Sequence, residues 1–332
     1  MYSLLSASLA ALLALQEPAA AAPKGRPAPG PAAGGSYLRS EDYRVARVGY
    51  RLGLAGRSYC PEPYPLTGLL LHHLAEYAAG NRAAAVEEFR IDRGPGVLAV
   101  IEGSPAARAG LAAGDVLLAV NARPFRSPLI VARAKDQDSA RRAIEGSEAQ
   151  LEQQLRQGPV RLAVARAGRE IEVSLAAEWG CPARVRLARS RQMNAFAHRG
   201  YAIVTTAMLG FLRSDDELAF VLGHEIAHNV LKHPQQLDEQ GVPRGWLSGI
   251  GKNGALVKAT EIAADQLGLR LAWAAGYDAS AAIPYWRRFY GKYDRLPRLF
   301  RTHPRLRERE RLARETLASL GAASSDLGPE RP

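Results

Sequence analysis

The pentapeptide His224-Glu225-Ile226-Ala227-His228 carries the side chains best suited to chemistry. Residues four apart on a helix lie one turn apart on the same face, so His224 and His228 can present two imidazoles to one metal ion. Glu225 points about 100° away from His224, too far round to join as a ligand. It can still reach a water on that metal and take its proton. This spacing is typical of a zinc hydrolase.

The residues around the pentapeptide predict a helix. Ser214 and Glu217 have the spacing of a capping box, with Ser214 as the N-cap. Apolar residues then recur at helical spacing, and Pro234 is expected to stop the run. These residues are Leu218, Val221, Leu222, Ile226 and Val230. The motif is therefore expected in mid-helix, and an ordinary helix with two surface histidines is the alternative.

A catalytic zinc needs a third protein ligand and one open position. The pattern H-E-x-x-H-x-x-G-x-x-H would place a histidine at position 234, where this chain has Pro234. His233 lies five residues beyond His228 and would face about 140° away from it on a continuing helix. The sequence therefore disfavours this pattern, and the third zinc ligand is expected further along the chain.

The stretch around Glu261 reads as a second helix that stops at Gly276. Glu261 is the candidate third ligand. Asp265, one turn further on, can accept a hydrogen bond from a ligand histidine and fix its tautomer. A solvated acidic helix face is the alternative. We therefore predict one Zn²⁺ per chain, held by His224, His228 and Glu261, which is a gluzincin site.

Four motifs in this order resemble a known peptidase family. They are Asn194-Ala195-Phe196-Ala197 before Gly200, Leu222 to Asn229 around the pentapeptide, Glu261-x-x-x-Asp265, and Thr302-His303-Pro304 followed by Arg309. The family includes HtpX, the CaaX prenyl endopeptidases and the soluble protease-chaperone BepA, and the resemblance covers about residues 185 to 315. It implies a zinc endopeptidase that acts on protein substrates. No transmembrane helices flank the core, which favours the soluble branch.

The resemblance also places His303 near the metal. His303 is a candidate catalytic donor to the tetrahedral oxyanion, or a latch that occupies the open zinc position, or a histidine satisfied in a loop. Arg309 is expected to anchor the last helix through a salt bridge. The β-branched run Gly200, Tyr201, Ala202, Ile203 and Val204 is expected to be an edge strand that binds the substrate backbone by strand addition. A buried core strand would show the same pattern.

The upstream half resembles the bacterial PDZ domains attached to envelope proteases. A strand at 96–101 precedes Gly103-Ser104-Pro105, a one-turn helix capped by Ser104, and the turn at Gly114-Asp115. A hairpin is expected about Ala167-Gly168, and a helix within 126–157. The first strand is expected near Val48 to Gly56 or Thr67 to His72. A degenerate PDZ domain that acts only as a spacer is the alternative to a peptide-binding one.

The N-terminus predicts export. Residues 3–15 form an apolar run too short to span a bilayer, and small residues offer cleavage near Ala21 or Ala22. An uncleaved anchor is the alternative, because no Lys or Arg precedes Lys24. Two cysteines in an exported, periplasmic chain predict one disulfide, Cys60 to Cys181, with two separate buried thiols as the alternative.

The expected division of the chain follows from these motifs. It comprises a signal peptide (1–22), a flexible linker rich in Pro, Ala and Gly (23–40), a PDZ-like domain with an N-terminal extension (41–178), a zinc peptidase domain (179–320) and a disordered tail (321–332). The net charge of +11 comes from scattered arginines and is expected to be solvated surface, with peripheral contact with anionic envelope surfaces as the alternative. Nucleic-acid motifs and an integral membrane span are absent from the sequence, and His72-His73 reads as part of an apolar stretch.

The sequence therefore predicts an α+β protein in which a mainly helical zincin domain with a short edge sheet follows a small β-rich PDZ-like domain. The predicted function is an exported metalloendopeptidase that cleaves envelope proteins in quality control, with Glu225 as general base. A PDZ-containing chaperone or adaptor with weak or latent peptidase activity is one alternative. A tightly regulated processing enzyme with a single native substrate is the other.

Overall fold

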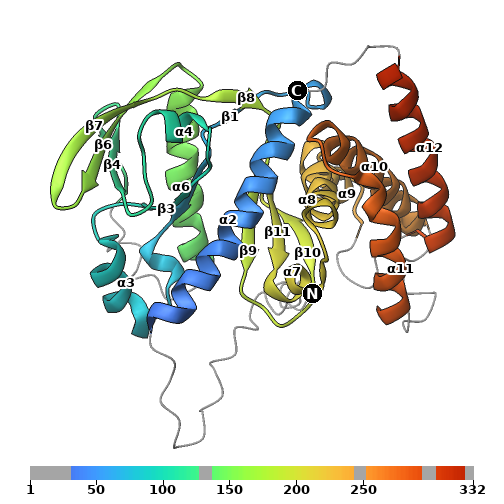
Figure 1. The fold of residues 1–332 in the computed structure, drawn as a ribbon, viewed down its shortest axis with the longest axis horizontal. Helices are drawn as coiled ribbons and strands as arrows, with labels where there is room; N and C mark the ends of the chain where they lie inside the picture. The colour runs from blue at the N-terminus through green and yellow to red at the C-terminus, as the bar shows by residue number, and fades with distance from the viewer. Residues whose placement is uncertain (1–30, 127–136, 243–251, 294–303, 326–332) are drawn as a thin grey trace, which may run out of the picture. The chain divides into compact units, whose positions relative to one another are not determined.

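The structure is a computed structural model that describes residues 31–126, 137–242, 252–293 and 304–325 (Figure 1). It is an α+β fold, as expected, and its contacts divide the chain into two compact units. We name the units after the expectations from their sequences: the PDZ unit comprises Tyr37–Tyr50 and Pro63–Gly180, and the peptidase unit contains Arg51–Glu62 and the chain from Cys181 onward. The PDZ unit is thus largely an insertion between two segments of the peptidase unit.

A six-stranded antiparallel sheet forms the PDZ unit, with the order β2-β3-β4-β6-β7 and with β5 paired to β4. Its strands are β2 (Leu69–His72), β3 (Gly96–Val100), β4 (Val116–Val120), β5 (Arg123–Pro124), β6 (Val160–Arg166) and β7 (Arg169–Leu175). A separate pair joins β1 (Tyr64–Leu66) to β8 (Glu178–Gly180). The helices are α3 (Arg82–Phe89), α4 (Pro105–Arg108), α6 (Gln137–Leu155) and the 3-10 turns η2 (Leu74–Glu76) and η3 (Ala79–Asn81).

Alternating apolar residues give this sheet two buried faces. Leu151 and Leu155 of α6 pack in one cluster with Leu117 and Leu162 of the sheet. Ala46, from the first helix α2 (Pro31–Ala55), packs with Leu70 of β2 in another. Two helices therefore contribute side chains to separate apolar clusters of one sheet.

Most of the local expectations for this unit agree with the structure. Ser104 Oγ accepts a hydrogen bond from the Ala107 amide and caps α4, and β6 and β7 form the expected hairpin. Of the two segments proposed for the first strand, 67–72 contains β2, whereas 48–55 is helical. The second segment thus supplies the outermost strand of the sheet.

The peptidase unit joins a small sheet to a group of helices. Its strands are β9 (Arg184–Ala188), β10 (Ala195–His198) and β11 (Tyr201–Thr205). Its helices are α7 (Thr206–Phe211), α8 (Asp215–Val230), α9 (His233–Glu239), α10 (Lys252–Ala274), α11 (Ala282–Tyr293) and α12 (Leu306–Ser325), with 3-10 turns η1 (Gly56–Tyr59) and η5 (Ala279–Ala281). The helix α8 packs against α10 and against β10 and β11.

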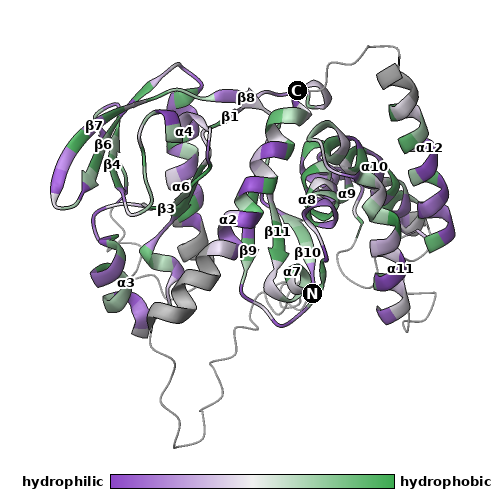
Figure 2. Cartoon of the chain, in the orientation of Figure 1, coloured by the Kyte–Doolittle hydropathy of each residue, from purple (hydrophilic) through white to green (hydrophobic). Residues whose placement is uncertain are grey.

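The expected edge strand at Gly200–Val204 is instead the middle strand of this sheet. β11 pairs antiparallel with β10 and parallel with β9, so both rows of its backbone hydrogen-bonding groups are used. All five of its residues are buried, and Figure 2 colours it largely hydrophobic. The prediction of a substrate-binding edge here is wrong, because the buried core strand has the same sequence pattern. Within the described chain, the edges of this sheet are β9 and β10.

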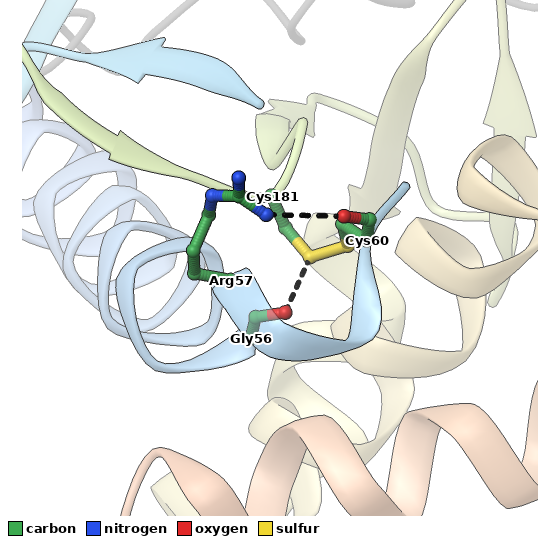
Figure 3. The surroundings of a disulfide bond; sticks show 4 residues. All are labelled: Gly56, Arg57, Cys60 and Cys181. Atoms are coloured by element: carbon green, nitrogen blue, oxygen red, sulfur yellow. Dashed lines mark hydrogen bonds between the residues drawn. A yellow bond between two sulfur atoms is a disulfide. The ribbon is translucent and has the colours of Figure 1, made fainter. Parts of the chain in front are cut away.

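The expected disulfide between Cys60 and Cys181 is formed (Figure 3). It joins the residue after η1 to the residue after β8, and the Cys181 amide donates to the Gly53 carbonyl at 2.8 Å. A Cβ on Gly56 would lie 2.4 Å from a methyl of Leu271 and 3.0 Å from the sulfur of Cys181. Gly56 therefore lets the disulfide and η1 pack directly on α10.

We expect the paired change Cys60→Ser and Cys181→Ser to lower stability, because it releases a link across 121 residues. The chain-entropy model gives about 4 to 5 kcal/mol for so long a loop, and less if the inserted PDZ unit stays folded when the peptidase unit opens. Urea unfolding of the oxidised protein and the variant measures the difference. Equal unfolding midpoints would contradict the prediction.

Three expected boundaries differ from the structure. The expected linker ran from 23 to 40, but α2 begins at Pro31. The expected tail began at 321, but α12 continues to Ser325. Residues 51–62 belong to the peptidase unit rather than to the PDZ-like part. The expected signal peptide lies outside the described residues.

Candidate metal centre

The helix α8 carries the motif His224-Glu225-Ile226-Ala227-His228. Ser214 Oγ accepts from the Glu217 amide, and the Glu217 carboxylate accepts from the Arg213 amide at 2.9 Å. The helix ends at Val230, four residues before the proline that was expected to stop it. His228 therefore lies in the last turn of α8 and not in mid-helix.

The helix α10 crosses α8 at two glycines. An added Cβ on Gly268 would lie 2.8 Å from the backbone nitrogen of His224, and one on Gly223 would lie 2.9 Å from the Gly268 carbonyl oxygen. The neighbours in both cases are backbone atoms, which cannot rotate away. This contact lets Glu261, on α10, approach the histidines on α8.

We expect Gly268→Ala to push the two helices apart and weaken metal binding, because no side chain fits between their backbones. Overpacking of this kind typically costs about 1 to 3 kcal/mol. Zinc affinity by competition with a chromophoric chelator, together with urea unfolding, measures both effects. Gly291→Ala on α11 is the control, because an added Cβ there meets nothing within 4 Å. The prediction fails if the two variants bind zinc equally tightly.

Three donors converge from these helices. The Nε2 atoms of His224 and His228 lie 3.1 Å apart. The Glu261 oxygens lie 3.5 Å from Nε2 of His224 and 3.4 Å from Nε2 of His228. Ligands about 2.0 to 2.1 Å from a tetrahedral zinc are separated by about 3.3 Å, so the donor set and its spacing fit zinc. Among the described residues, this is the one group of at least three such side chains found close enough to hold a metal.

Asp265 supports this centre from behind. Its Oδ1 lies 2.9 Å from Nδ1 of His224. This distance suits a hydrogen bond, but the direction from Nδ1 to Oδ1 does not meet the angle that a hydrogen bond requires. Arg309 of α12 donates to the same carboxylate from Nε at 2.7 Å and from NH2 at 2.5 Å. The expected salt bridge of Arg309 is thus present and anchors α12 to α10, whereas the hydrogen bond expected from His224 to Asp265 stays a prediction.

Burial and neighbouring charges shift the pKa values of His224 and Asp265 in opposite directions. Burial lowers the pKa of His224, but the carboxylates of Asp265 and Glu261 outweigh it and raise the pKa to about 10. Burial raises the pKa of Asp265, yet Arg309 and His224 hold it below its usual value. The metal-free centre is therefore strongly polarised, with Asp265 ionised against Arg309.

Glu225 is buried, at 8 % exposure, and follows the ligand His224 directly on α8.

His303 lies outside the described residues, so its proposed roles stay predictions. The adjacent Pro304 is described, and its carbonyl accepts a hydrogen bond from the Tyr290 hydroxyl at 2.8 Å.

His233 is the site residue that the sequence argument dismissed. Lys232 has a left-handed backbone, with φ of 55°, so the chain reverses where a continuing helix was assumed. As a result, Nδ1 of His233 lies 3.0 Å from Nδ1 of His228. Burial lowers the pKa of His233 to about 4, so its ring is neutral at pH 7. The sequence gives no sign of this left-handed residue, because Lys232 is not a glycine, and only Pro234 was expected to end the helix.

His72 and His73, expected as part of an apolar stretch, make local contacts within the PDZ unit. Nδ1 of His72 lies 2.8 Å from the Tyr77 hydroxyl, and Nδ1 of His73 accepts from the Ala75 amide at 3.2 Å and caps η2. Both side chains are buried in the PDZ unit. They serve the local fold.

His224, His228 and Glu261, which come from two helices, form a candidate metal centre with the ligand set of a gluzincin, and Glu225 directly follows His224 in the chain. Residues 156–251 and 248–317 match the profile of Peptidase family M48, and residues 96–144 match the profile of the PDZ domain. The match to the M48 profile falls on residues 156 to 317, which include the motifs that carry the resemblance inferred from the sequence.

Individual relatives cover smaller parts of the chain. The mitochondrial metalloendopeptidase OMA1 of Bos taurus is 29% identical over 35% of this chain and 28% of its own length. The chain thus matches less than a third of that relative. The HtrA3 PDZ domain bound to a phage-derived ligand is 23% identical, with a TM-score of 0.25, over 36% of this chain and 88% of that one. The HtrA-type protease AlgW with a decapeptide is 20% identical, with a TM-score of 0.22, over 36% and 29%.

Within the described residues, no helix combines the length and hydropathy needed to cross a bilayer.

Proposed function

We propose that this protein is a zinc-dependent metalloendopeptidase. The observation that carries the proposal is the spacing of the donors of His224, His228 and Glu261, 3.1 to 3.5 Å apart, with Glu225 next along the same helix. When bound there, Zn²⁺ supplies Lewis-acid chemistry that acidifies water and polarises a carbonyl group. The match of this region to the family M48 profile and its similarity to the metalloendopeptidase OMA1 support peptide bonds as the target.

Other residues of the chain transfer the proton and orient the metal ligands. The Glu225 carboxylate takes the proton of the attacking water and delivers it to the leaving amine. Asp265 orients the His224 ring through Nδ1, and Arg309 neutralises Asp265. Burial of Glu225 and His224 keeps bulk water from screening these charges.

Casein hydrolysis by the purified protein tests the activity. We expect casein cleavage with stoichiometric zinc, loss of cleavage after chelation, and recovery of cleavage when zinc is returned. The reason is that His224, His228 and Glu261 do not activate water without the metal. Inductively coupled plasma analysis of the same samples gives the zinc content. One zinc per chain without cleavage of casein or of shorter peptides would contradict an unregulated endopeptidase.

We further propose that the protein is exported to the periplasm and acts on misfolded or unassembled envelope proteins. Two features support this. The apolar run at 3–15 precedes small residues suited to signal cleavage, and a disulfide persists in oxidising compartments. N-terminal sequencing of the protein from a periplasmic extract tests export, and a start at or just after Ala21 or Ala22 is expected.

The PDZ unit is proposed to present protein or peptide substrates. β2 is the terminal strand of its sheet, and an extended peptide can add to such an edge. Titration of the full chain with labelled peptides that end in a free or an amidated carboxyl group tests this proposal. Binding of neither peptide would favour a spacer role for the unit.

A chaperone or adaptor with weak or latent peptidase activity is the second candidate, favoured by the match of residues 96–144 of the same chain to the PDZ domain profile. Suppression of aggregation of a denatured protein, measured with Glu225→Gln, separates the two. A chaperone keeps this activity without Glu225, whereas protection that depends on cleavage disappears.

A further inference from the structure

Each nitrogen of the His228 ring faces a different neighbour. Nε2 lies 3.1 Å from Nε2 of His224 and 3.4 Å from Glu261, where the metal is expected. Nδ1 lies 3.0 Å from Nδ1 of His233. The rings of His228 and His233 meet edge to face, with centroids 5.0 Å apart. His233 therefore stands behind the ligand, on the side away from the metal.

We propose that His233 is a positioning residue whose Nδ1 accepts the Nδ1 proton of His228 and thereby directs Nε2 of His228 to the metal. A histidine that binds through Nε2 carries its proton on Nδ1, and that proton needs an acceptor when the ring is largely buried. Asp265 meets the same need for His224. The proposal rests on the proposed zinc function and assigns the corresponding support of the second ligand.

The backbone holds His233 in this place. The Leu231 amide donates to the Ala227 carbonyl at 2.9 Å, and the Lys232 amide donates to the Asn229 carbonyl at 3.1 Å, which closes the end of α8. Lys232 then turns the chain in a left-handed conformation. Pro234 fixes φ in the first turn of α9. The 4 % exposure of His233 leaves its ring few alternative orientations.

A neutral acceptor suits this position better than a second carboxylate. Asp265 carries its charge at low cost because Arg309 pairs with it on two atoms. A further buried carboxylate behind His228 would need its own cation. An imidazole accepts the proton without adding a charge to the centre.

The test compares His233→Phe, which keeps the ring volume but has no acceptor, with His233→Asn, which keeps an acceptor near the place of Nδ1. Zinc affinity of the full-length protein is measured by chelator competition. We expect His233→Phe to weaken binding 10- to 100-fold, and His233→Asn to stay within about threefold of the unmodified protein. Equal affinities in the two variants would overturn the proposal.

The control is Gln236→Ala on α9. Its side chain donates to the Leu231 carbonyl at 2.8 Å and so stabilises the start of α9. We expect zinc affinity within about threefold of the unmodified protein. A loss as large as that of His233→Phe would assign the effect to loosening of α9 and overturn the role of the acceptor.

The unmodified protein provides a test that does not depend on the folding of a variant. Long-range ¹H–¹⁵N spectra of the zinc-loaded, histidine-labelled protein report which ring nitrogens carry protons. We expect a proton on Nδ1 of His228 and none on Nδ1 of His233, and a proton on the latter would overturn the proposal. If the unmodified protein bound no zinc, the proposed function itself would fail. If it binds zinc but the two His233 variants do not differ, only the role of His233 fails.

Discussion

Replacement of Glu225 by Gln is expected to reduce casein hydrolysis by about 10²- to 10⁴-fold, the range typical of a lost general acid–base group. The amide keeps the size of the buried side chain but cannot take a proton from water. Glu225 is not among the three metal-binding candidates, so zinc content and affinity are expected to stay unchanged. Initial rates and metal analysis on the same preparation measure both properties.

A matched change is available on the neighbouring helix. Glu239 is exposed at the end of α9, and Glu239→Gln should leave the rate within about twofold. If Glu225→Gln retained full activity with zinc bound, the assignment of the general base would be wrong. If both variants lost activity together with zinc, the loss would report damage to the fold rather than to proton transfer.

Removal of one partner from the Asp265–Arg309 pair has the second-largest expected effect. Both side chains are buried, at 4 % and 7 % exposure, and Arg309 also stacks 4.5 Å from the Trp286 ring. Asp265→Ala leaves a buried guanidinium without its carboxylate, and Arg309→Met leaves the carboxylate without its cation. Each is expected to cost about 3 to 5 kcal/mol of stability, measured by urea unfolding of the metal-free protein.

The double variant Asp265→Leu with Arg309→Met separates the two roles of Asp265. It removes both buried charges, so most of the lost stability should return. Zinc affinity should stay 10- to 100-fold weaker, because Nδ1 of His224 has lost its acceptor. Tight zinc binding by the double variant would contradict the orienting role. Glu315→Ala is the control, since it breaks only an exposed pair with Arg311 on α12 and should cost under about 1 kcal/mol.

The metal ligands could be predicted from the sequence because helical periodicity is local. The four-residue spacing of His224 and His228 and that of Glu261 and Asp265 each place two side chains on one helix face. Both helices are present, and the donor atoms of His224, His228 and Glu261 lie close together. The cap at Ser214 and the 160–175 hairpin were predictable for the same reason, since their hydrogen bonds join near neighbours in the chain.

Contacts between distant segments could not be predicted in this way. The placement of β11 in mid-sheet depends on parallel pairing with β9, and a single apolar run does not reveal whether one or both of its edges are used. The close approach of Gly223 and Gly268 joins two helices whose relative position has no local signal. The assignment of residues 51–62 to the peptidase unit likewise depends on contacts with segments more than a hundred residues away.

His233 illustrates the difference between what the sequence determines and what only the tertiary structure decides. The sequence determined that a histidine lies five residues after the second ligand, and helix geometry alone would turn it away from that ligand. The tertiary structure ends the helix at Val230 and gives Lys232 a left-handed backbone, which brings the ring back to His228. Residue types alone thus led to the prediction of zinc and its chemistry, because coordination depends on donor atoms. The fold decided which side chains support those donors, because that depends on backbone dihedrals and on packing between segments far apart in the chain.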